Sequence, residues 1–244
     1  MREFELFGVT FSTYWTMLLV ATVAIIVHSA VRAKNAGYGK IRAMVLSLLL
    51  ILFGCIGAKL LFILENPASK FSISGGMSFF GSVYFIPFAY FLIAPLFKTK
   101  FGKCLDFVGI YVPLVLAFMR IGCFMNDCCG ALPITVFGVT FTPPVQLVEC
   151  FFDILIFAYL FYREKKGNIT ETGLQYPIFM VSYGVLRMIM EIFRDSVKNM
   201  WGLSRGQWLS VLTFLVGVMI ILIIKHRAKN IQNFSERGKD NEEV

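Results

Sequence analysis

Seven long apolar stretches, separated by short polar connections, restrict the fold of this sequence more than any other feature. A helix needs about 20 predominantly apolar residues to cross a bilayer, and each stretch is close to that length. The predicted fold class is therefore all-α, a polytopic membrane helix bundle. The seven spans are expected at Tyr14–Val31, Met44–Leu64, Met77–Phe97, Leu105–Gly122, Val145–Tyr162, Pro177–Phe193 and Gln207–Ile224.

The composition agrees with a membrane protein and argues against a nucleic-acid partner. Hydrophobic residues make up 57% of the chain and charged residues only 16%, whereas soluble domains are nearer a quarter charged. The net charge of +8 could suggest binding to nucleic acid. Most lysines and arginines, however, lie in short connections between apolar stretches, which is the pattern that sets membrane topology. We therefore expect no nucleic-acid partner.

The distribution of basic residues predicts the orientation of the bundle. One alternating set of connections carries 15 lysines and arginines, and the other set carries 5. Because the basic side of a membrane protein faces the cytoplasm, we expect the N-terminus outside and the C-terminus cytoplasmic. Residues 1–227 should form the seven-helix membrane domain, and residues 228–244 a polar, disordered cytoplasmic tail.

Several charged or amide side chains lie inside the predicted spans, where a charge costs about 2.5 kcal/mol or more. Arg187, Glu191 and Arg194 have the i, i+4, i+7 spacing of one helix face. The predicted topology places all of these side chains in the same outer half of the membrane. The full set is Lys59, Arg120, Gln146, Glu149, Arg187, Glu191 and Arg194.

These buried charges have two interpretations. Arg187 and Glu191 could form a structural ion pair, with Arg194 extending to the membrane interface. Against this, four cations and two carboxylates leave two positive charges without a partner. A buried cationic surplus suits an anionic ligand, and three of the four cations are arginines, whose forked guanidinium matches phosphate. We therefore expect a lipid phosphate to bind here.

Three cysteines lie together in the segment that follows the fourth span. Cys123, Cys128 and Cys129 share this segment with Asn126 and Asp127. The spacing differs from the C-x-x-C of zinc sites and no histidine is close in sequence, so we expect no metal site. A disulfide between two of them on the oxidising outer face is favoured over a metal site. A reactive thiol or plain packing of small side chains are the alternatives.

Glycines open the third predicted span. Gly76 and Gly81 belong to the run Gly75–Ser82. Glycine allows a ligand to approach the backbone closely, and helix N-termini attract phosphate. This run is a second candidate contact for an anionic lipid.

Taken in order along the chain, these motifs resemble the bacterial prolipoprotein diacylglyceryl transferase family. The resemblance covers about Phe11 to Ile224. Its elements are Tyr14, Gly57-Ala58-Lys59-Leu60, Gly75-Gly76-Met77-Ser78 with Gly81, Arg120-Ile121-Gly122-Cys123-Phe124 with Asn126, Pro144-Val145-Gln146-Leu147-Val148-Glu149, Tyr183-Gly184-Val185-Leu186-Arg187 with Glu191, Phe193, Arg194 and Asp195, and Ser204-Arg205-Gly206-Gln207.

The resemblance implies a multi-pass enzyme of the bacterial cytoplasmic (inner) membrane that needs no cofactor. Such an enzyme moves diacylglyceryl from phosphatidylglycerol to the lipobox cysteine thiol of a preprolipoprotein signal peptide, forming a thioether and releasing glycerol 1-phosphate. Its lipid donor here would be phosphatidylglycerol or another anionic phospholipid. The implied catalytic residues are Arg120, Arg187 and Glu191. The implied substrate-binding residues are Tyr14, Lys59, Gly76, Gly81, Asn126, Gln146, Glu149 and Arg194.

Three departures from the family pattern leave other functions open. Phe80 stands where the family often carries histidine, Cys123 replaces an asparagine, and Cys128 stands where an acidic residue is usual. One alternative is a related lipid-group transferase with another acceptor, acting through Cys128 or Cys123. A further alternative is a non-catalytic protein that binds or transports anionic phospholipid.

Overall fold

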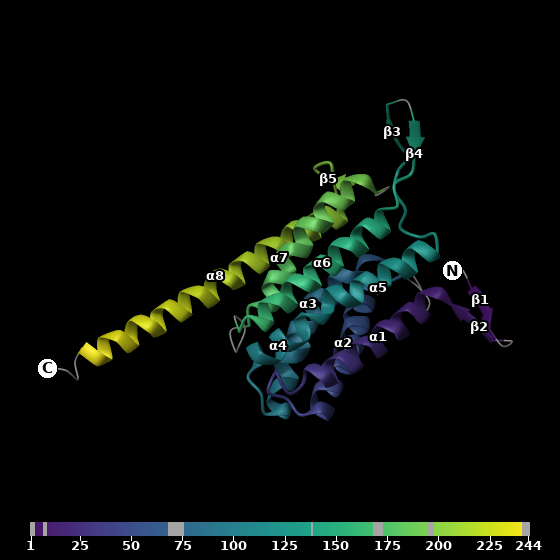
Figure 1. Cartoon of the computed structure of the whole chain (residues 1–244). Helices are drawn as coiled ribbons and strands as arrows, with labels where there is room; N and C mark the ends of the chain where they lie inside the picture. Colours follow the sequence, from purple (N-terminus) through teal and green to yellow (C-terminus); the bar gives the residue numbers. More distant parts are fainter. Residues whose placement is uncertain are drawn as a thin grey trace.

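The chain folds into a bundle of helices with three small hairpins at one end (Figure 1). The computed structural model describes residues 3–6, 9–67, 76–137, 139–167, 173–194 and 198–240. Within these residues, seven helical segments are long and apolar enough to cross a membrane, which confirms the predicted fold class. The segments are Thr13–Arg32, Lys40–Glu65, Phe79–Phe97, Phe101–Met125, Val145–Lys165, Gln175–Phe193 and Arg205–Asn230.

Three of these segments are composite, so the helices carry more labels than there are spans. The single helices are α1 (Thr13–Arg32), α2 (Lys40–Glu65) and α6 (Val145–Lys165). The third span joins α3 (Phe79–Ile93) to η1 (Ala94–Phe97), the fourth joins α4 (Phe101–Gly109) to α5 (Tyr111–Met125), and the sixth joins α7 (Gln175–Met190) to η2 (Glu191–Phe193). The seventh lies within α8 (Arg205–Asp240).

Two prolines explain local features of these helices. Pro113 lacks the N–H that would bond to the carbonyl of Gly109, and the fourth span is interrupted beside that residue. Pro87 lies inside α3 and leaves the carbonyl of Val83 without its helical donor. The hydroxyl of Tyr176 on α7 donates to that carbonyl at 2.7 Å. A neighbouring helix thus satisfies the backbone group that proline leaves unpaired, as bilayer burial requires.

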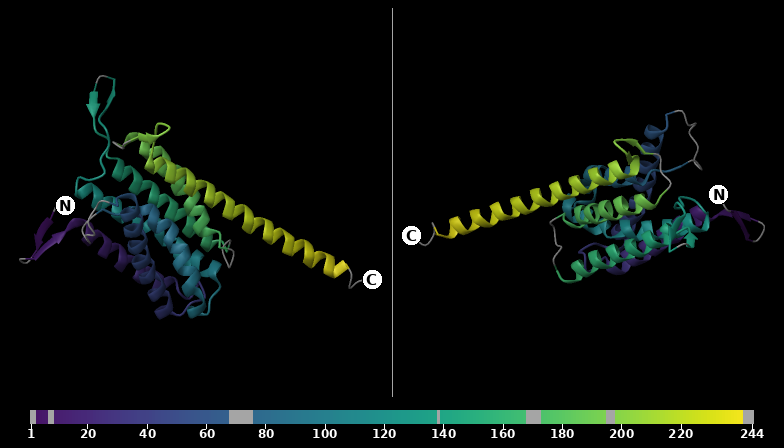
Figure 2. Two further views of the ribbon diagram at one scale, coloured as in Figure 1. Left: turned by 180° about the vertical axis from the view of Figure 1, so that it is seen from behind. Right: turned by 90° about the horizontal axis from the view of Figure 1, so that it is seen from above.

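The three antiparallel hairpins lie at the end of the bundle that holds the N-terminus, and α8 carries the C-terminus away from the opposite end (Figures 1 and 2). Each hairpin is a two-stranded sheet of its own. In their registers Glu3 pairs with Ser12, Ile134 with Phe141, and Lys198 with Ser204. The strands are β1 (Glu3–Leu6) with β2 (Val9–Ser12), β3 (Ile134–Val136) with β4 (Val139–Phe141), and β5 (Lys198–Met200) with β6 (Leu203–Ser204).

Small residues let α2 and α3 approach each other closely. A Cβ atom added to Gly57 would lie 2.5 Å from the carbonyl oxygen of Gly81, so neither position has room for a side chain. The Ser82 hydroxyl donates to the carbonyl of Gly54 at 2.6 Å across the same interface. Small residues and a serine hydrogen bond are the usual means of packing helices in lipid. The contact fixes the entrance of α3 against the second half of α2.

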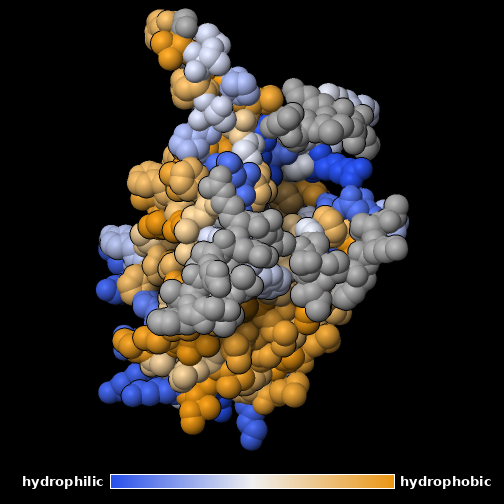
Figure 3. Space-filling view, turned by 90° about the vertical axis from the view of Figure 1, so that its right-hand side faces the viewer, coloured by the Kyte–Doolittle hydropathy of each residue, from blue (hydrophilic) through white to orange (hydrophobic). Residues whose placement is uncertain are grey.

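Large apolar side chains cover the outside of the bundle, as expected for a surface that faces lipid. On α1 they form a stripe at intervals of four residues, comprising Leu19, Val23, Val27 and Val31. Figure 3 shows a broad apolar area over the lower half of the face that it views, with polar side chains along the lower edge of this area and in the upper part of the view.

The tail differs from the prediction. Helix α8 continues without a break past the expected boundary at residues 227–228 and ends at Asp240, so the predicted disorder is wrong for residues 228–240. The physical reason lies in the residues after Lys225, which include no proline and no glycine before Gly238. A helix that has already been nucleated in the bundle can therefore propagate into this polar segment.

Candidate active site

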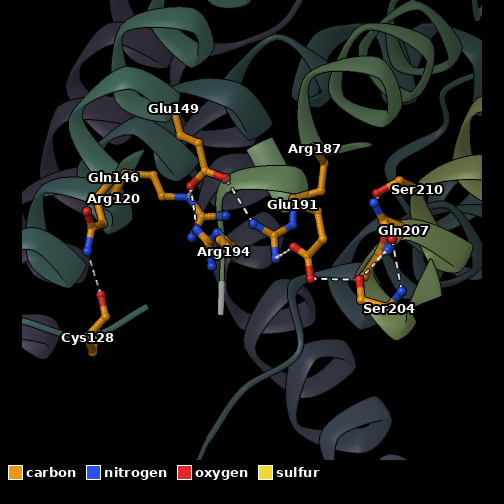
Figure 4. A network of polar contacts seen from close by, with 11 residues as sticks. Arg120, Cys128, Gln146, Glu149, Arg187, Glu191, Arg194, Ser204, Gln207 and Ser210 are labelled. Carbon is orange, nitrogen blue, oxygen red and sulfur yellow. Dashed lines mark hydrogen bonds and ion pairs between the residues drawn. The ribbon is translucent and has the colours of Figure 1, made fainter. Parts of the chain in front are cut away.

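The ends of three spans bring charged side chains together at the hairpin end of the bundle. Arg120 lies in the last turns of α5, Glu149 in the first turns of α6, and Arg187 near the end of α7. Glu191 opens η2, and Arg194 follows it in an extended conformation. We call these five residues the charge network. The sequence predicted that they share one depth, and the structure brings them into direct contact (Figure 4).

Glu149 is the centre of the charge network. Its Oε1 accepts from Nη1 of Arg187 at 2.9 Å. Its Oε2 lies 2.8 Å from Nε of Arg120 and 2.6 Å from Nη2 of Arg194. All four side chains are at least 88% buried, so water screens these contacts only weakly. One carboxylate therefore fixes three guanidinium groups that come from three separate segments of the chain.

Glu191 connects the network to the last helix. Its Oε2 lies 2.6 Å from Nη2 of Arg187, and its Oε1 accepts from the Ser204 hydroxyl at 2.9 Å. Ser204 also accepts from the backbone N–H of Gln207 at 3.1 Å, while the Gln207 side chain accepts from the N–H of Ser204 at 2.9 Å. This reciprocal pair caps the start of α8. Even Gly206 is constrained, because a Cβ there would lie 2.6 Å from Oε1 of Glu191.

The connected network carries a smaller surplus of positive charge than the two charges that the sequence predicted. Three arginines and two glutamates leave one surplus positive charge in the connected group. Lys59, which the sequence included in the surplus, lies apart from these ion pairs. Its ammonium donates to the carbonyl of Gly76 at 3.4 Å and lies 5.5 Å from the centre of the Phe62 ring. The predicted role of Lys59 in substrate binding therefore rests on the entrance of α3 and not on the network.

A cavity of about 440 Å³ lies beside the network, within the usual size range of ligand sites. Its wall is mostly apolar and includes Leu18, Leu50, Ile86, Val112, Leu116 and Met119. Arg120 is the one residue with a fixed charge that lines it in the described part of the chain. Tyr14 and Asn126 also line it, and the Tyr14 hydroxyl lies 3.8 Å from Sδ of Met77. The cavity thus combines an apolar interior with one cationic group.

Arg120 belongs to both the network and the cavity. It contacts Glu149 through Nε. This Nε contact is an ion pair without the geometry of a hydrogen bond, and among the described residues the two terminal NH₂ groups of Arg120 form no hydrogen bond. The guanidinium is therefore fixed through one nitrogen while its outer edge is available to a ligand. This is the geometry that forked recognition of a phosphate needs.

The other predicted site residues occupy two different environments. Gly76 lines the cavity, whereas Gly81 packs against Gly57. Gln146 lies next to the network and donates through Nε2 to the carbonyl of Cys128 at 2.8 Å. Phe80 is buried with its ring 5.9 Å from that of Tyr183, and the neighbouring Phe79 lines the cavity instead. Gly75 and Asp195 of the quoted motifs lie outside the described residues.

The three clustered cysteines all line the cavity. Cys123, Cys128 and Cys129 are free thiols, and their sulfur atoms lie within 4.8 Å of one another. A disulfide between two of them, one of the predicted possibilities, is thus not formed in the structure. Burial raises the pKa of Cys128. A hydrogen bond from Cys123, together with the charges of Arg194 and Arg120, lowers the pKa of Cys129.

Comparison with known proteins agrees with this geometry. A model of the prolipoprotein diacylglyceryl transferase family matches residues 3–223, nearly the whole chain. The chain belongs to this family. Members of similar sequence are named phosphatidylglycerol–prolipoprotein diacylglyceryl transferase. One from Clostridium tetani is 28% identical over 92% of this chain and 97% of its own length. One from Pasteurella multocida is 32% identical over 79% of this chain and 80% of its own length.

Membership of the prolipoprotein diacylglyceryl transferase family makes the chain a transferase. Together with the seven apolar segments, it describes a multi-pass membrane enzyme of bacterial lipoprotein biosynthesis. The family therefore favours the enzymatic hypotheses over a non-catalytic lipid-binding protein. The roles of individual residues, including those of Arg187 and Glu191 in catalysis, stay predictions.

Sequence reasoning missed one ionisable residue beside the charge network. Asp153 lies on α6 one turn beyond Glu149 and is 1% exposed. Among the described residues, neither of its carboxylate oxygens has a hydrogen-bond partner. The spacing could have revealed it, because Gln146, Glu149 and Asp153 follow one another at i, i+3 and i+7 on one helix face. Ser204 was quoted in a motif, but its contact with Glu191 had no signal in the sequence.

Proposed function

We propose that this chain transfers the diacylglyceryl group of phosphatidylglycerol, or of another anionic phospholipid, to the cysteine thiol of a preprolipoprotein signal peptide. The names of its relatives supply the substrate classes. The observation that carries the proposal is Arg120, which Glu149 fixes through Nε while its terminal NH₂ groups are available at an apolar cavity. The phosphate would bind this guanidinium, and the acyl chains would occupy the apolar interior and the lipid beyond it.

The chemistry of the transfer explains why a fixed cation is needed. The acceptor sulfur forms a bond to a glycerol carbon, and the bond between that carbon and the phosphate oxygen breaks. The phosphate leaves with the electron pair as glycerol 1-phosphate, and the thiol proton is released. Negative charge therefore grows on the departing phosphate, and a pre-oriented guanidinium in a water-poor site stabilises it without reorganising.

The remaining network residues act in this proposal as positioning residues. Glu149 holds Arg120, and Arg187 and Arg194 offset the negative charge of Glu149, so the carboxylate does not neutralise the cavity. Glu191 holds Arg187 and connects it to α8. Tyr14 and Asn126 line the cavity and are candidates to contact the glycerol backbone.

We further propose that the enzyme lies in the bacterial inner membrane with the charge network in the outer half and the C-terminus in the cytoplasm. The 15 to 5 asymmetry of basic residues supports this orientation. Fusions of a fluorescent protein and of a periplasmic phosphatase to the C-terminus test it. Fluorescence without phosphatase activity is expected, and the opposite result would reverse the topology.

Reconstitution tests the transfer reaction itself. Purified protein is mixed with phosphatidylglycerol and a lipobox peptide, and both released glycerol phosphate and the mass of the peptide are measured. We expect release matched by a gain of one diacylglyceryl group on the peptide. Arg120→Lys should lower the turnover about 100-fold or more, on the scale of removing one transition-state hydrogen-bond donor. Arg32→Lys, at the opposite end of the bundle, is the control. No release from the wild-type protein, beside an active family member, would refute the proposal.

A further inference from the structure

The spacing of the three clustered cysteines along the sequence argued against a metal site. The fold of the segment brings the three thiols together in spite of that spacing. Cys123 lies in the last turn of α5, and the chain then turns back on itself. Asp127 and Cys129 have φ angles of +54° and +60°, the left-handed region that residues with a side chain seldom adopt. Two such residues let Cys128 and Cys129 return to Cys123, so three thiols five or six residues apart lie within 4.8 Å.

This turn is held from two sides. The backbone N–H of Cys128 donates to the carbonyl of Cys123 at 3.1 Å, which connects the turn to α5. Gln146 on α6 donates to the carbonyl of Cys128 at 2.8 Å (Figure 4). A loop fixed by both of its neighbouring helices keeps its thiols in place without a disulfide, which is the preorganisation that a ligand site requires.

The arrangement fits a soft metal ion better than it fits packing. Zinc binds thiolates at about 2.3 Å, which places the sulfurs of a tetrahedral site about 3.8 Å apart. Three sulfurs already within 4.8 Å need only small rotations to reach one ion. Three thiolates with a divalent ion carry one net negative charge. The neighbouring charge network carries one net positive charge, so its field favours an anionic zinc–thiolate group beside it.

In the described part of the chain, the same cavity offers no conventional base for the acceptor thiol. Among the described residues, its lining includes no histidine, aspartate, glutamate or lysine. Its ionisable groups are Tyr14, Arg120 and four cysteines. A thiol attacks as the thiolate, so a cavity that alkylates a thiol must remove its proton in some other way. A metal ion does this directly, because a thiol that coordinates it is deprotonated outright.

We propose that Cys123, Cys128 and Cys129 bind one zinc ion whose fourth coordination position faces the cavity and takes the acceptor thiol. This inference rests on the proposed transfer reaction. Three protein ligands with one open position are the pattern of catalytic zinc. On binding, the acceptor thiol gives its proton to water. Its sulfur then forms the bond to carbon as the bond from carbon to phosphate oxygen breaks. The zinc keeps its oxidation state, and the neutral thioether leaves as the weaker ligand.

Metal binding is tested first, without reference to activity. The full-length protein is purified in detergent, stripped with a chelator and titrated with Co²⁺, whose thiolate charge-transfer absorption reports sulfur ligation. We expect one ion per chain in the wild type and in Cys104→Ser, a buried cysteine of α4 that does not line the cavity. Cys128→Ser and Cys129→Ser should bind more than about 100-fold more weakly, since changes outside the ligand shell alone cost about 10–100-fold.

A second test uses only the wild-type protein, so its result does not depend on whether the cysteine variants fold. Maleimide is added with and without zinc, and labelled cysteines are identified by mass spectrometry. Zinc should protect Cys123, Cys128 and Cys129 and leave the labelling of Cys104, Cys55 and Cys150 unchanged. Labelling that zinc does not alter, a disulfide within the cluster, or a covalent diacylglyceryl adduct on one of the three thiols would overturn the proposal.

Glycerol phosphate release then separates this proposal from the transfer reaction on which it rests. Activity that is lost on chelation and restored by zinc supports both. Full activity in metal-free protein refutes the zinc proposal and leaves the transfer reaction standing. Tight Co²⁺ binding by the three cysteines without any transfer to a lipobox peptide supports the metal site, removes its proposed role in activating the thiol, and refutes the transfer reaction.

Discussion

Replacing Glu149 by glutamine should destabilise the protein more than the same replacement at any other carboxylate of the site. Glu149 accepts hydrogen bonds from Arg187 at 2.9 Å and from Arg194 at 2.6 Å and forms an ion pair with Arg120 at 2.8 Å, and an amide keeps the shape but loses the charge. The amide also turns an NH₂ group toward at least one arginine. The substitution raises the net charge of the connected network from one positive charge to two, in a site that water scarcely reaches.

The magnitude follows from the three contacts that are lost. A hydrogen bond to a charged group contributes about 1.5–3 kcal/mol, so the two that Glu149 accepts give an upper estimate of about 3–6 kcal/mol, and the ion pair with Arg120 is lost as well. The arginines share one partner, so their contributions do not add, and breaking a buried ion pair costs about 3–5 kcal/mol in measured cases. We expect a loss of about 4 kcal/mol in the free energy of unfolding. For a chain of this size that lowers Tm by about 8–16 °C.

Asp153→Asn is the matched control for this substitution. Asp153 lies one turn further along α6, is equally buried and is also an acidic side chain replaced by its amide. Since its carboxylate has no hydrogen-bond partner among the described residues, removing a charge there should leave Tm unchanged or raise it. Melting in lipid nanodiscs, followed by tryptophan fluorescence, compares the two variants. Equal shifts in Tm would refute the idea that the three contacts, and not burial alone, make Glu149 important.

Three further substitutions test other parts of the fold. Gly81→Ala should lower the free energy of unfolding by about 1–3 kcal/mol or more, because the added methyl group would clash with the backbone of Gly57. Gly130→Ala is the control in the same melting assay and should be neutral, because among the described residues no atom beyond its chain neighbours lies within 4 Å of the added methyl group. Tyr176→Phe should cost about 1–3 kcal/mol, because the carbonyl of Val83 loses the hydroxyl that replaces the N–H missing at Pro87, and faster hydrogen exchange around Pro87 would show it. Arg32→Lys should lower Tm but leave turnover per folded molecule unchanged, since the lysine cannot keep both the 2.7 Å contact to Glu164 and the 2.9 Å bond to the Phe107 carbonyl.

The spans were predictable from the sequence because length and apolarity alone decide them. All seven predicted stretches lie within or overlap the observed helices. The second and fourth spans were each predicted to start four residues late, the fourth because Lys103 was counted with the connection. Asp106 is buried and accepts backbone N–H groups of Gly173 and Gln175 at 2.8 and 2.7 Å, so it caps α7 from inside the bundle. A carboxylate with such a partner 69 residues away cannot be told from a solvated one by local pattern.

The sequence predicted which residues belong to the site, but not which of their side chains contact one another. The spacing of Arg187 and Glu191 predicted their ion pair, because both residues belong to one helix. The contact of Arg120 with Glu149 depends on how two spans rotate about their axes, which depth alone does not determine. Lys59 shows the same limit, since it shares the predicted depth but points to Gly76 and Phe62. The cysteine spacing was misleading because two left-handed residues fold the segment back on itself.

The arrangement of charge favours a ligand site over a static structural lock. In a structural lock, each buried cation would be paired with its own carboxylate. Arg32, at the other end of the bundle, is such a case, because it donates to Glu164 and to the carbonyl of Phe107. At the hairpin end, two carboxylates instead serve three arginines. The arginine that lines the cavity pairs with Glu149 through Nε, and among the described residues its terminal NH₂ groups form no hydrogen bond. Burying a surplus cation beside an apolar cavity is costly unless an anion enters with it. An amphipathic anion pairs its charge with Arg120 and buries its own apolar chains against the apolar lining of the cavity. A free phosphate would pair with Arg120 but would leave the apolar lining without a partner.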